Sequence, residues 1–280
     1  MTIMHMAGAR PHGKGWSNDY TNTVLLMHCD GVNGATTFID SSQYAHTFSR
    51  DQAKLTTSQK KFGTAALDLT PGILNVNNAA AAEFTFGTKD FTFEFWFRVL
   101  AVSMYNTLID FRSGSSGKQP LVQIQPDDRI LLYTNDGANH YFATPNVTAN
   151  VWHHLAVSRA AGTTRGFLNG VMGTSFADAI DYPFAGASKP MIGALTSTDL
   201  NMSGYLDEIR VMIGVGKYTT NFTPPTAAFP PSCRISPAFA PRCSGSTPPR
   251  RERRSRRSSA SRRRPMPGAT RRARCSAFPR

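Results

Sequence analysis

The stretch Phe91-Thr-Phe-Glu-Phe-Trp-Phe-Arg-Val99 decides the fold class of this 280-residue chain. Large apolar residues recur in it at every second position, which is the period of a β-strand. One face of the strand carries Phe91, Phe93, Phe95, Phe97 and Val99. The other face carries Thr92, Glu94, Trp96 and Arg98. Because the apolar face needs a core to cover it, the stretch predicts one strand of a sheet that packs on a second layer.

Further short runs along the chain have the same apolar or β-branched character and are separated by Gly, Pro, Asn and Asp. They are Val24–His28, Ala65–Leu69, Ile73–Val76, Thr107–Phe111, Leu121–Ile124, Ile130–Tyr133, Val151–Arg159, Gly166–Asn169 and Tyr205–Ile213. The pair Asn169-Gly170 is the strongest hairpin signal, since a type I′ turn needs positive φ at both central residues. Helical propensity is confined to Ala79–Glu83. The pattern predicts an all-β fold, an antiparallel two-sheet β-sandwich of the jelly-roll type.

Charge divides the chain into unequal parts. Residues 231–280 hold 15 of the 31 basic residues and one acid, Glu252, and so carry a net charge of +14, whereas the rest of the chain carries −1. The same segment has no Leu, Val, Tyr or Trp, so it cannot build a core and is expected to be disordered. We expect a poorly ordered segment at 1–20, a jelly-roll domain at 21–230 and a disordered Arg-rich tail at 231–280.

The Arg-rich tail has two interpretations, which the sequence leaves open. A genuine basic arm would bind polyanions such as nucleic acid, because each Arg that neutralises a phosphate releases a counterion. Alternatively, the tail is a frame-shifted extension, since a GC-rich message read in a shifted frame encodes Arg, Pro, Ser and Ala. The nearly neutral remainder does not support a nucleic-acid-binding fold.

Cysteine usage and hydropathy exclude further classes. Cys29 is the single Cys before residue 231, and no Cys or His spacing matches a zinc site, so Cys29 is expected to be a packed thiol. No window approaches 18 consecutive apolar residues, and Met1–Tyr20 lacks the apolar run of a signal peptide. We expect neither a signal peptide nor membrane insertion.

Several blocks of the sequence follow the order found in one protein family. They are Thr23–Gly34 with Phe38–Ser42, Lys61–Leu67, Asp90–Phe97, Val151–Arg159 with Phe167–Gly170, Gly204–Arg210 and Gly214–Thr226. Together they resemble the laminin-G-like, concanavalin A-like jelly-roll domains of phage and bacterial surface proteins, and the last block is similar to the closing segment of phage-type members. The resemblance implies one domain of two curved antiparallel sheets, with loops and a concave face available to ligands. This fold carries lectins, glycosidases, adhesion modules and virion proteins alike, so it does not set the function.

Acidic residues do not form the pattern of a glycosidase. A retaining enzyme needs two carboxylates about 5 Å apart, and before residue 231 the Glu residues are Glu83, Glu94 and Glu208, with no E-x-D-x-x-E arrangement. No G-x-S-x-G motif occurs either. Neighbouring strand residues diverge, so His153 and His154 cannot chelate one ion, and we expect one imidazole inside the sandwich and the other in solvent. The expectation is a non-enzymatic protein without catalytic residues.

Asp207 is expected to be buried, because alternation places it on the same face of Tyr205–Ile213 as Ile209. A buried carboxylate needs a partner, which could be backbone N–H groups, an Arg such as Arg98, or a cation. Calcium takes six to eight oxygen ligands, and relatives within the resembled family often bind it, although no complete ligand motif is present. The candidate calcium ligands are Asp30, Asp40 and Asp207.

Aromatic rings are a further signal, because sugars stack on Trp and Tyr side chains. Aromatic residues in or near predicted loops are Trp16, Tyr44, Tyr105, Tyr141 and Tyr182. Trp96 and Trp152 lie in predicted strands and are expected to pack.

These observations lead to one functional hypothesis and two alternatives. The hypothesis is a non-enzymatic binding module of a phage tail or virion surface that recognises a glycan or another cell-surface ligand. One alternative is a structural decoration protein that binds neighbouring virion subunits, or further copies of itself, without sugar. The other is polyanion binding through the Arg-rich tail. We expect the protein in a phage particle if it is phage-encoded and in the cytoplasm otherwise.

Overall fold

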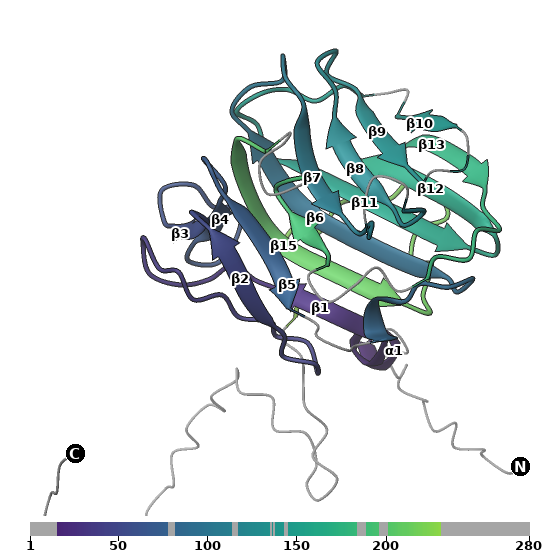
Figure 1. Ribbon diagram of the computed structural model, residues 1–280, viewed down its shortest axis with the longest axis horizontal. Coiled ribbons are helices and arrows are strands. Elements are labelled where there is room, and N and C mark those ends of the chain that lie inside the picture. Colours follow the sequence, from purple (N-terminus) through teal and green to yellow (C-terminus); the bar gives the residue numbers. More distant parts are fainter. Residues whose placement is uncertain are drawn as a thin grey trace, which may run out of the picture. The chain divides into compact units, whose positions relative to one another are not determined.

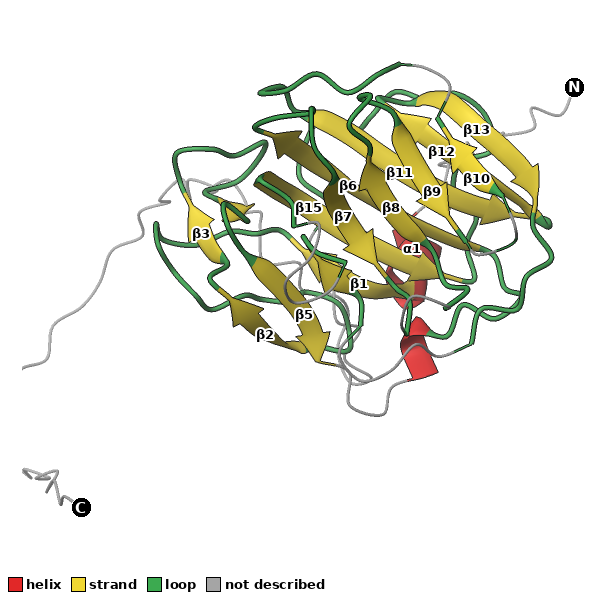
Figure 2. Cartoon of the chain, turned by 45° about the horizontal axis from the view of Figure 1, so that its top comes forward, coloured by secondary structure: helices red, strands yellow, loops and turns green. Residues whose placement is uncertain are grey.

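The computed structural model describes residues 16–77, 82–113, 117–134, 136, 138–142, 145–183, 189–195 and 201–230. The Arg-rich tail at 231–280 and the first 15 residues of the chain, which were expected to be disordered or poorly ordered, lie outside the described residues. Two sheets stack face to face, and every strand pair in them is antiparallel, which confirms the expected β-sandwich (Figure 1, Figure 2).

The eight-stranded sheet has the order β13-β12-β11-β6-β15-β4-β3, with β1 paired to β15. Its strands are β1 (Thr23–Met27), β3 (Lys54–Thr56), β4 (Ala66–Asp68), β6 (Phe91–Val99), β11 (His153–Ala160), β12 (Thr163–Leu168), β13 (Val171–Ala177) and β15 (Gly204–Ile213). The seven-stranded sheet has the order β10-β9-β8-β7-β14-β5-β2. Its strands are β2 (Thr47–Asp51), β5 (Ile73–Asn77), β7 (Asn106–Asp110), β8 (Leu121–Ile124), β9 (Ile130–Tyr133), β10 (Asn139–Tyr141) and β14 (Met191–Ile192).

Helical structure is confined, within the described residues, to two short elements. Helix α1 (Trp16–Asn22) leads directly into β1, and the 3-10 turn η1 (Ala82–Phe84) lies between β5 and β6. Neither has the length and apolar character that crossing a membrane requires.

The core lies between the sheets and is organised around the apolar face of β6. Its Phe and Val side chains are at most 1% exposed, as their alternation predicted. Phe93 contacts Phe111 at the end of β7, with ring centroids 5.2 Å apart. Phe91 contacts Phe86 at 4.9 Å, and Phe86 in turn contacts Phe111 at 5.0 Å. These aromatic contacts join the two sheets.

The turn between β12 and β13 is the hairpin that Asn169-Gly170 predicted. Asn169 has φ 52° and Gly170 has φ 78°, so both lie in the left-handed region. Asn169 Oδ1 also accepts a hydrogen bond from the backbone N–H of His154, 2.9 Å away on β11. The turn is thereby tied to the strand beside it.

Strand β15 contains a bulge that changes which residues face the core. Glu208 has φ 50°, and the register with β6 shifts between Asp207 and Arg210. As a result Leu206 and Ile209 both belong to the core, while Asp207 lies opposite Trp96 on the other face of the sheet. Asp207 is buried as predicted, but the prediction that it shares a face with Ile209 is wrong.

Candidate functional site

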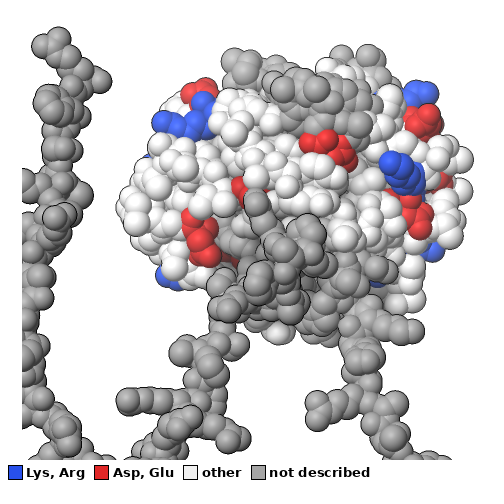
Figure 3. Space-filling view, turned by 90° about the horizontal axis from the view of Figure 1, so that it is seen from below, with Lys and Arg blue, Asp and Glu red and all other residues white. Residues whose placement is uncertain are grey.

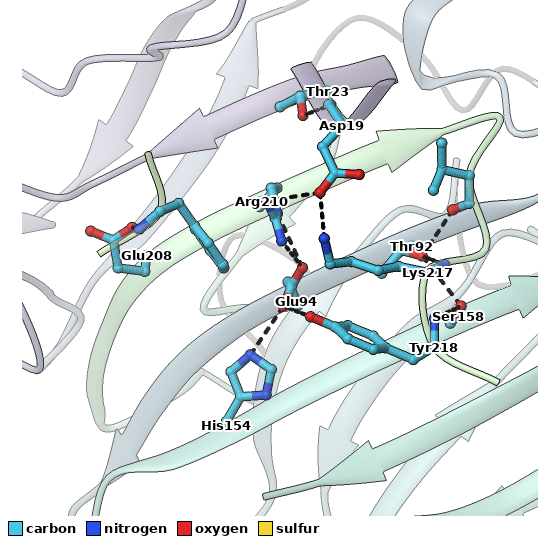
Figure 4. A network of polar contacts seen from close by, with 12 residues as sticks. Asp19, Thr23, Thr92, Glu94, His154, Ser158, Glu208, Arg210, Lys217 and Tyr218 are labelled. Atoms are coloured by element: carbon cyan, nitrogen blue, oxygen red, sulfur yellow. Dashed lines mark hydrogen bonds and ion pairs between the residues drawn. The ribbon is translucent and has the colours of Figure 1, made fainter. Parts of the chain in front are cut away.

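The outer face of the eight-stranded sheet, turned away from the core, carries the largest cluster of buried charges. Glu94 on β6 is fully buried and accepts hydrogen bonds from Arg210 Nε at 3.0 Å and from the Tyr218 hydroxyl at 2.9 Å (Figure 4). His154 Nε2 lies 3.2 Å from its second oxygen. Burial opposes ionisation of Glu94, but the charges of Arg210 and His154 outweigh it and lower its pKa to about 2. Glu94 is therefore a carboxylate at neutral pH, paired with the Arg210 guanidinium.

The chain's own closing segment, residues 214–230, covers this cluster. The backbone N–H of Lys217 donates to Thr92 Oγ1 at 2.9 Å, and that of Tyr218 donates to Ser158 Oγ at 3.1 Å. Phe222 stacks on Tyr218 with ring centroids 3.7 Å apart. The Glu94 cluster thus binds the closing segment to the sheet, and Glu94 itself is fully buried.

The two neighbouring histidines are both buried, so the expectation that one of them faces solvent is wrong. His153 points into the core, stacks on Phe97 at 5.5 Å and contacts Asn169 Nδ2 through Nδ1 at 2.9 Å. Burial lowers the pKa of His153. His154 is fully buried on the opposite face, between Glu94 and the Phe222 ring. The divergence of the two rings was predicted correctly, but the closing segment that buries His154 was not foreseen.

The three candidate calcium ligands lie in separate hydrogen-bond sets. Asp40 accepts hydrogen bonds from the backbone N–H groups of Leu26, Ser42 and His46, and His46 Nδ1 lies 2.6 Å from its Oδ2. Burial opposes ionisation of Asp40, but these donors, His46 foremost, outweigh it and lower its pKa. Asp30 accepts a hydrogen bond from Thr64 Oγ1 at 2.9 Å.

Asp207 takes backbone partners rather than Arg98. The N–H groups of Lys61, Phe62 and Glu208 donate to it at 2.7, 3.0 and 2.9 Å. Burial nevertheless dominates and raises the pKa of Asp207 to about 7. In the part of the chain that the structure describes, no group of three or more His, Cys, Asp or Glu is arranged to hold a metal ion. Calcium binding by Asp30, Asp40 and Asp207 stays a prediction.

A small pocket of about 90 Å³ opens beside Asp30 at the end of β1. Its lining consists of Met27, His28, Cys29, Asp30, Phe38, Ile39, Ser41 and Leu55. Glu208 lies 3.0 Å from His28 Nδ1, and this contact raises the pKa of His28 despite its burial. Burial raises the pKa of the Cys29 thiol well above its usual range, so Cys29 is a packed, protonated thiol, as expected, rather than a nucleophile.

The Glu residues of the described chain do not form a catalytic pair. Glu83 contacts His46 Nε2 at 3.0 Å, Glu94 is paired with Arg210, and Glu208 is paired with His28. Each of these three Glu side chains is thus paired with a different basic residue.

The outer face of the seven-stranded sheet carries a different kind of surface. Strand register aligns one residue from each strand into a continuous cross-strand row, which consists of Asn139, Tyr133, Leu121, Asp110, Met191, Asn75 and Ser49. The neighbouring residues Leu132, Val122 and Ile192 point to the opposite face and belong to the core. The row therefore faces away from the core, and its ends at Asn139 and Ser49 are exposed.

A second row beside it adds polar groups. It consists of Tyr141, Leu131, Gln123 and Thr107. Gln123 Nε2 donates to Thr107 Oγ1 at 3.0 Å, and Gln125 Nε2 donates to Gln123 Oε1 at 2.8 Å. Arg129 lies over the Tyr141 ring, 4.2 Å from its centroid.

The centre of the cross-strand row holds charges. Arg112, just beyond β7, forms a two-pronged ion pair with Asp110 through Nε at 2.9 Å and Nη2 at 3.3 Å. Lys189 Nζ lies 3.5 Å from the second oxygen of Asp110. The guanidinium of Arg112 lies 5.5 Å from the centroid of the Tyr133 ring. Aromatic, amide and charged side chains thus share one face.

The structure sorts the aromatic residues that were singled out in the sequence. Tyr44 and Tyr105 are 44% and 43% exposed, and Tyr141 is half-buried on the second row. Tyr182 is buried, and its hydroxyl donates to Asp178 at 2.8 Å. Trp96 packs as expected, whereas the side chain of Trp16 lies outside the described residues.

The outer face of the seven-stranded sheet was not predicted as a site from the sequence, although one pattern in the sequence points to it. In Ile130-Leu-Leu-Tyr133 the alternation separates Leu131 and Tyr133 from the core residues Ile130 and Leu132. No comparable signal marks Arg112 and Lys189, which the pairing of β7 with β14 brings together.

Comparison with known proteins agrees with this fold. A family model described as the concanavalin A-like lectin/glucanases superfamily matches residues 75–214. No curated protein sequence matches the chain significantly.

Solved structures similar to the chain include domain 4 of an extracellular GH43 arabinanase from Geobacillus stearothermophilus in complex with arabinotriose. It has a TM-score of 0.54 and 15% identity, over 70% of this chain and 94% of that domain. The botulinum neurotoxin serotype D binding domain has a TM-score of 0.53 and 15% identity, over 73% of this chain and 50% of that one. The binding domain of Paraclostridial Mosquitocidal Protein 1 has a TM-score of 0.53 and 14% identity, over 69% and 49%. At such identities the likeness establishes the fold alone, and the chain spans only about half of each toxin domain.

Proposed function

Because the chain belongs to the concanavalin A-like lectin/glucanases superfamily, we propose that it is a glycan-binding module that uses the outer face of its seven-stranded sheet. The observation that carries the proposal is the cross-strand row together with Arg112, whose guanidinium lies 5.5 Å from the centroid of the Tyr133 ring and is paired with Asp110. Sugars are bound by such combinations, since a ring can stack on the aromatic face while hydroxyl groups bond to amide and charged groups.

The contrast between the two outer faces supports this choice. The outer face of the eight-stranded sheet is occupied by residues 214–230, whose contacts with Glu94 and Ser158 are internal. The seven-stranded sheet instead carries polar and aromatic side chains whose exposure increases toward both ends of the row. The most accessible parts of this second face are its two ends, since Asp110 and Leu121 at the centre of the row are 2% and 5% exposed.

We propose that binding is the whole activity and that no glycan is cleaved. The supporting observation is that Glu83, Glu94 and Glu208 are paired with His46, Arg210 and His28, so that no two of these Glu residues form the carboxylate pair of a glycosidase. The arabinanase domain in the comparison is bound to arabinotriose, which supports sugar binding on this architecture as a proposal for this chain.

The finer part of the proposal concerns the setting. The closing block Gly214–Thr226 is similar to that of phage-type members of the family, so we propose that the module lies on a phage tail or virion surface. The alternative of a decoration protein that binds neighbouring subunits without sugar is an outcome of the test below.

Polyanion binding by residues 231–280 is a separate proposal, because that tail lies outside the described residues. On the part of the face left uncovered in Figure 3, Lys and Arg lie close to Asp and Glu, without a continuous patch of either sign. Polyanion binding would accordingly disappear when residues 231–280 are deleted and would weaken steeply with salt.

The experiment that tests the function is a glycan-array screen of the full chain, with calcium in one arm and a chelator in the other. Binding to a defined set of glycans, without hydrolysis of them, is the expected result. Loss of binding with the chelator would support calcium binding by Asp30, Asp40 and Asp207, whereas unchanged binding would remove it. Failure to bind any glycan in either arm would contradict the proposal and favour the decoration protein.

A further inference from the structure

On the seven-stranded face the side chains of Arg112 and Lys189 both lie against the carboxylate of Asp110. Asp110 Oδ1 accepts hydrogen bonds from the backbone N–H of Arg112 at 3.0 Å and from its Nε at 2.9 Å. Asp110 Oδ2 lies 3.3 Å from Arg112 Nη2 and 3.5 Å from Lys189 Nζ. Both oxygens of Asp110 are therefore engaged, and the three side chains together hold one positive charge in excess.

This excess charge is held in a largely buried place. The side chains of Asp110, Arg112 and Lys189 are 2%, 7% and 14% exposed. Burial and the repulsion of Arg112 together outweigh the attraction of Asp110 and lower the pKa of Lys189. A charge in such surroundings is destabilised until an anion approaches it.

The geometry of Arg112 leaves a donor edge for such an anion. A guanidinium has five N–H donors and can bind two carboxylates, one along its Nε–Nη2 edge and one along its Nη1–Nη2 edge. Asp110 occupies the first edge. Among the described residues no contact uses Nη1. The second edge therefore matches a carboxylate supplied by a ligand.

Two further groups near Arg112 are of the kinds that contact a sugar ring and its hydroxyl groups. The Tyr133 ring lies 5.5 Å from the Arg112 guanidinium and offers an aromatic face. Gln119 is 1% exposed, and its Oε1 has no hydrogen-bond partner within the described residues. Gln119 Oε1 and Arg112 Cβ both lie 2.9 Å from the position that a Cβ on Gly117 would take, so Gln119 is near the base of the Arg112 side chain.

We propose that the glycan bound at this face is acidic, and that Arg112 and Lys189 bind the carboxylate of a uronic acid or another carboxylated sugar. This inference rests on the proposed function and names the class of its ligand. The planar fork of Arg112 selects a carboxylate, Lys189 supplies the second charge, and Tyr133 lies against the sugar ring. Asp110 acts as a positioning residue that fixes the guanidinium.

The test compares one ligand in two charge states on the full-length protein. A uronic-acid oligosaccharide and its methyl ester are titrated by calorimetry, and a neutral oligosaccharide and a sulfated one of equal length are titrated beside them. We expect the acid to bind about tenfold more tightly than its ester, because a charge-assisted hydrogen bond is lost on esterification. We also expect affinity for the acid to fall as salt is added.

A pair of variants assigns the effect to residues. Lys189→Gln leaves the Arg112–Asp110 pair in place and is expected to weaken binding of the acid about tenfold and binding of the ester by clearly less. Lys54→Gln is the matched control, since Lys54 lies on the other sheet with a 51% exposed side chain and is expected to change neither affinity. Thermal unfolding of each variant reports whether the fold is retained.

The outcomes separate this inference from the proposed function. Equal binding of the acid, its ester and the neutral sugar would overturn the acidic-glycan proposal and leave glycan binding intact. Preference for the sulfated sugar over the carboxylated one would overturn the carboxylate assignment. Binding of none of these probes, together with a negative glycan array, would overturn both proposals.

Discussion

The carbonyl oxygen of Phe222 occupies the space that a side chain at Gly170 would need. A Cβ on Gly170 would lie 1.9 Å from Phe222 O, and the backbone N–H of Phe222 donates to Gly170 O at 2.9 Å. The β12–β13 hairpin and the closing segment thus contact each other through their backbones. The choice of Gly in the hairpin turn reflects this contact as well as the turn itself.

Replacement of Gly170 by Ala is therefore expected to lower the free energy of unfolding by more than the left-handed backbone conformation alone would. Gly162 provides the matched comparison, since its φ of 70° is similar to the 78° of Gly170 but nothing lies within 4 Å of its Cβ position. We expect Gly162→Ala to lower the free energy of unfolding by about 1 kcal/mol and Gly170→Ala by at least about 3 kcal/mol. Urea denaturation of both variants measures the difference. Equal losses would show that the contact with Phe222 is not a constraint.

Replacement of Arg159 by Lys is expected to destabilise the folded protein strongly. It is 1% exposed, lies between the rings of Phe91 and Tyr182 at 5.0 and 4.9 Å, and donates to the carbonyl oxygens of Gly87, Lys89 and Ile180. A Lys cannot reach these acceptors together, and each one left without a donor costs about 1–3 kcal/mol. We expect Arg159→Lys to lower the free energy of unfolding by about 3 kcal/mol or more.

The control for this substitution is Arg165→Lys. Arg165 lies on the neighbouring strand, is half-buried and donates to a single carbonyl oxygen, that of Thr163. Its replacement is expected to change the free energy of unfolding by less than about 1 kcal/mol. Similar losses in the two variants would contradict the role given to the guanidinium of Arg159.

The ion pair of Glu94 with Arg210 is expected to hold the closing segment on its sheet. Arg210→Gln leaves a buried carboxylate without its main cation, which costs about 3–5 kcal/mol. Adding Glu94→Gln to that variant removes the unpaired charge and is expected to restore part of the loss. Chemical denaturation of the single and double variants measures both steps. A double variant less stable than Arg210→Gln by a further several kcal/mol would argue against this assignment.

Stability is expected to depend on pH through Asp207. Its folded pKa of about 7 lies above the usual 3.8, so the folded state retains a proton that the unfolded state has lost between these values. The free energy of unfolding contributed by Asp207 therefore falls as pH rises from about 4 to about 7, by about 1.4 kcal/mol for each unit of raised pKa. Asp207→Asn keeps an acceptor for the backbone N–H groups and is expected to gain stability relative to the natural protein over this range. A stability difference between the two proteins that is constant from pH 4 to pH 8 would show that Asp207 is ionised normally.

The sandwich could be predicted from sequence wherever burial leaves a clear alternation. Strands β8 and β9 have the predicted bounds, because both alternate core residues with outer-face residues around a turn at Asp127-Asp128. Strands β2 and β13 were missed, since they lie at the edges of their sheets and are largely exposed, with little apolar patterning to mark them. The bulge at Glu208 was also missed, because Glu is not a residue type that indicates a positive φ.

The candidate site was less predictable than the fold for a geometric reason. Arg112 and Lys189 are far apart in the chain and meet only because Met191 on β14 pairs with Asp110 on β7. Register of this kind depends on tertiary structure, which residue types alone do not specify. Asp207, by contrast, was predicted to be buried and is, with backbone N–H groups as its partners, whereas Asp40 was named only as a candidate calcium ligand and its burial against His46 was not foreseen.

The central claim is that the outer face of the seven-stranded sheet binds a glycan, and Tyr133 tests it most directly. Affinity for the best ligand from the array is measured by calorimetry for the natural protein, for Tyr133→Ala, and for Tyr205→Ala on the opposite sheet. Both tyrosines are half-buried, so the two variants remove similar surfaces. We expect Tyr133→Ala to weaken binding about tenfold through the loss of ring stacking, and Tyr205→Ala to leave it unchanged. Unchanged affinity in Tyr133→Ala, with the fold intact, would contradict the claim.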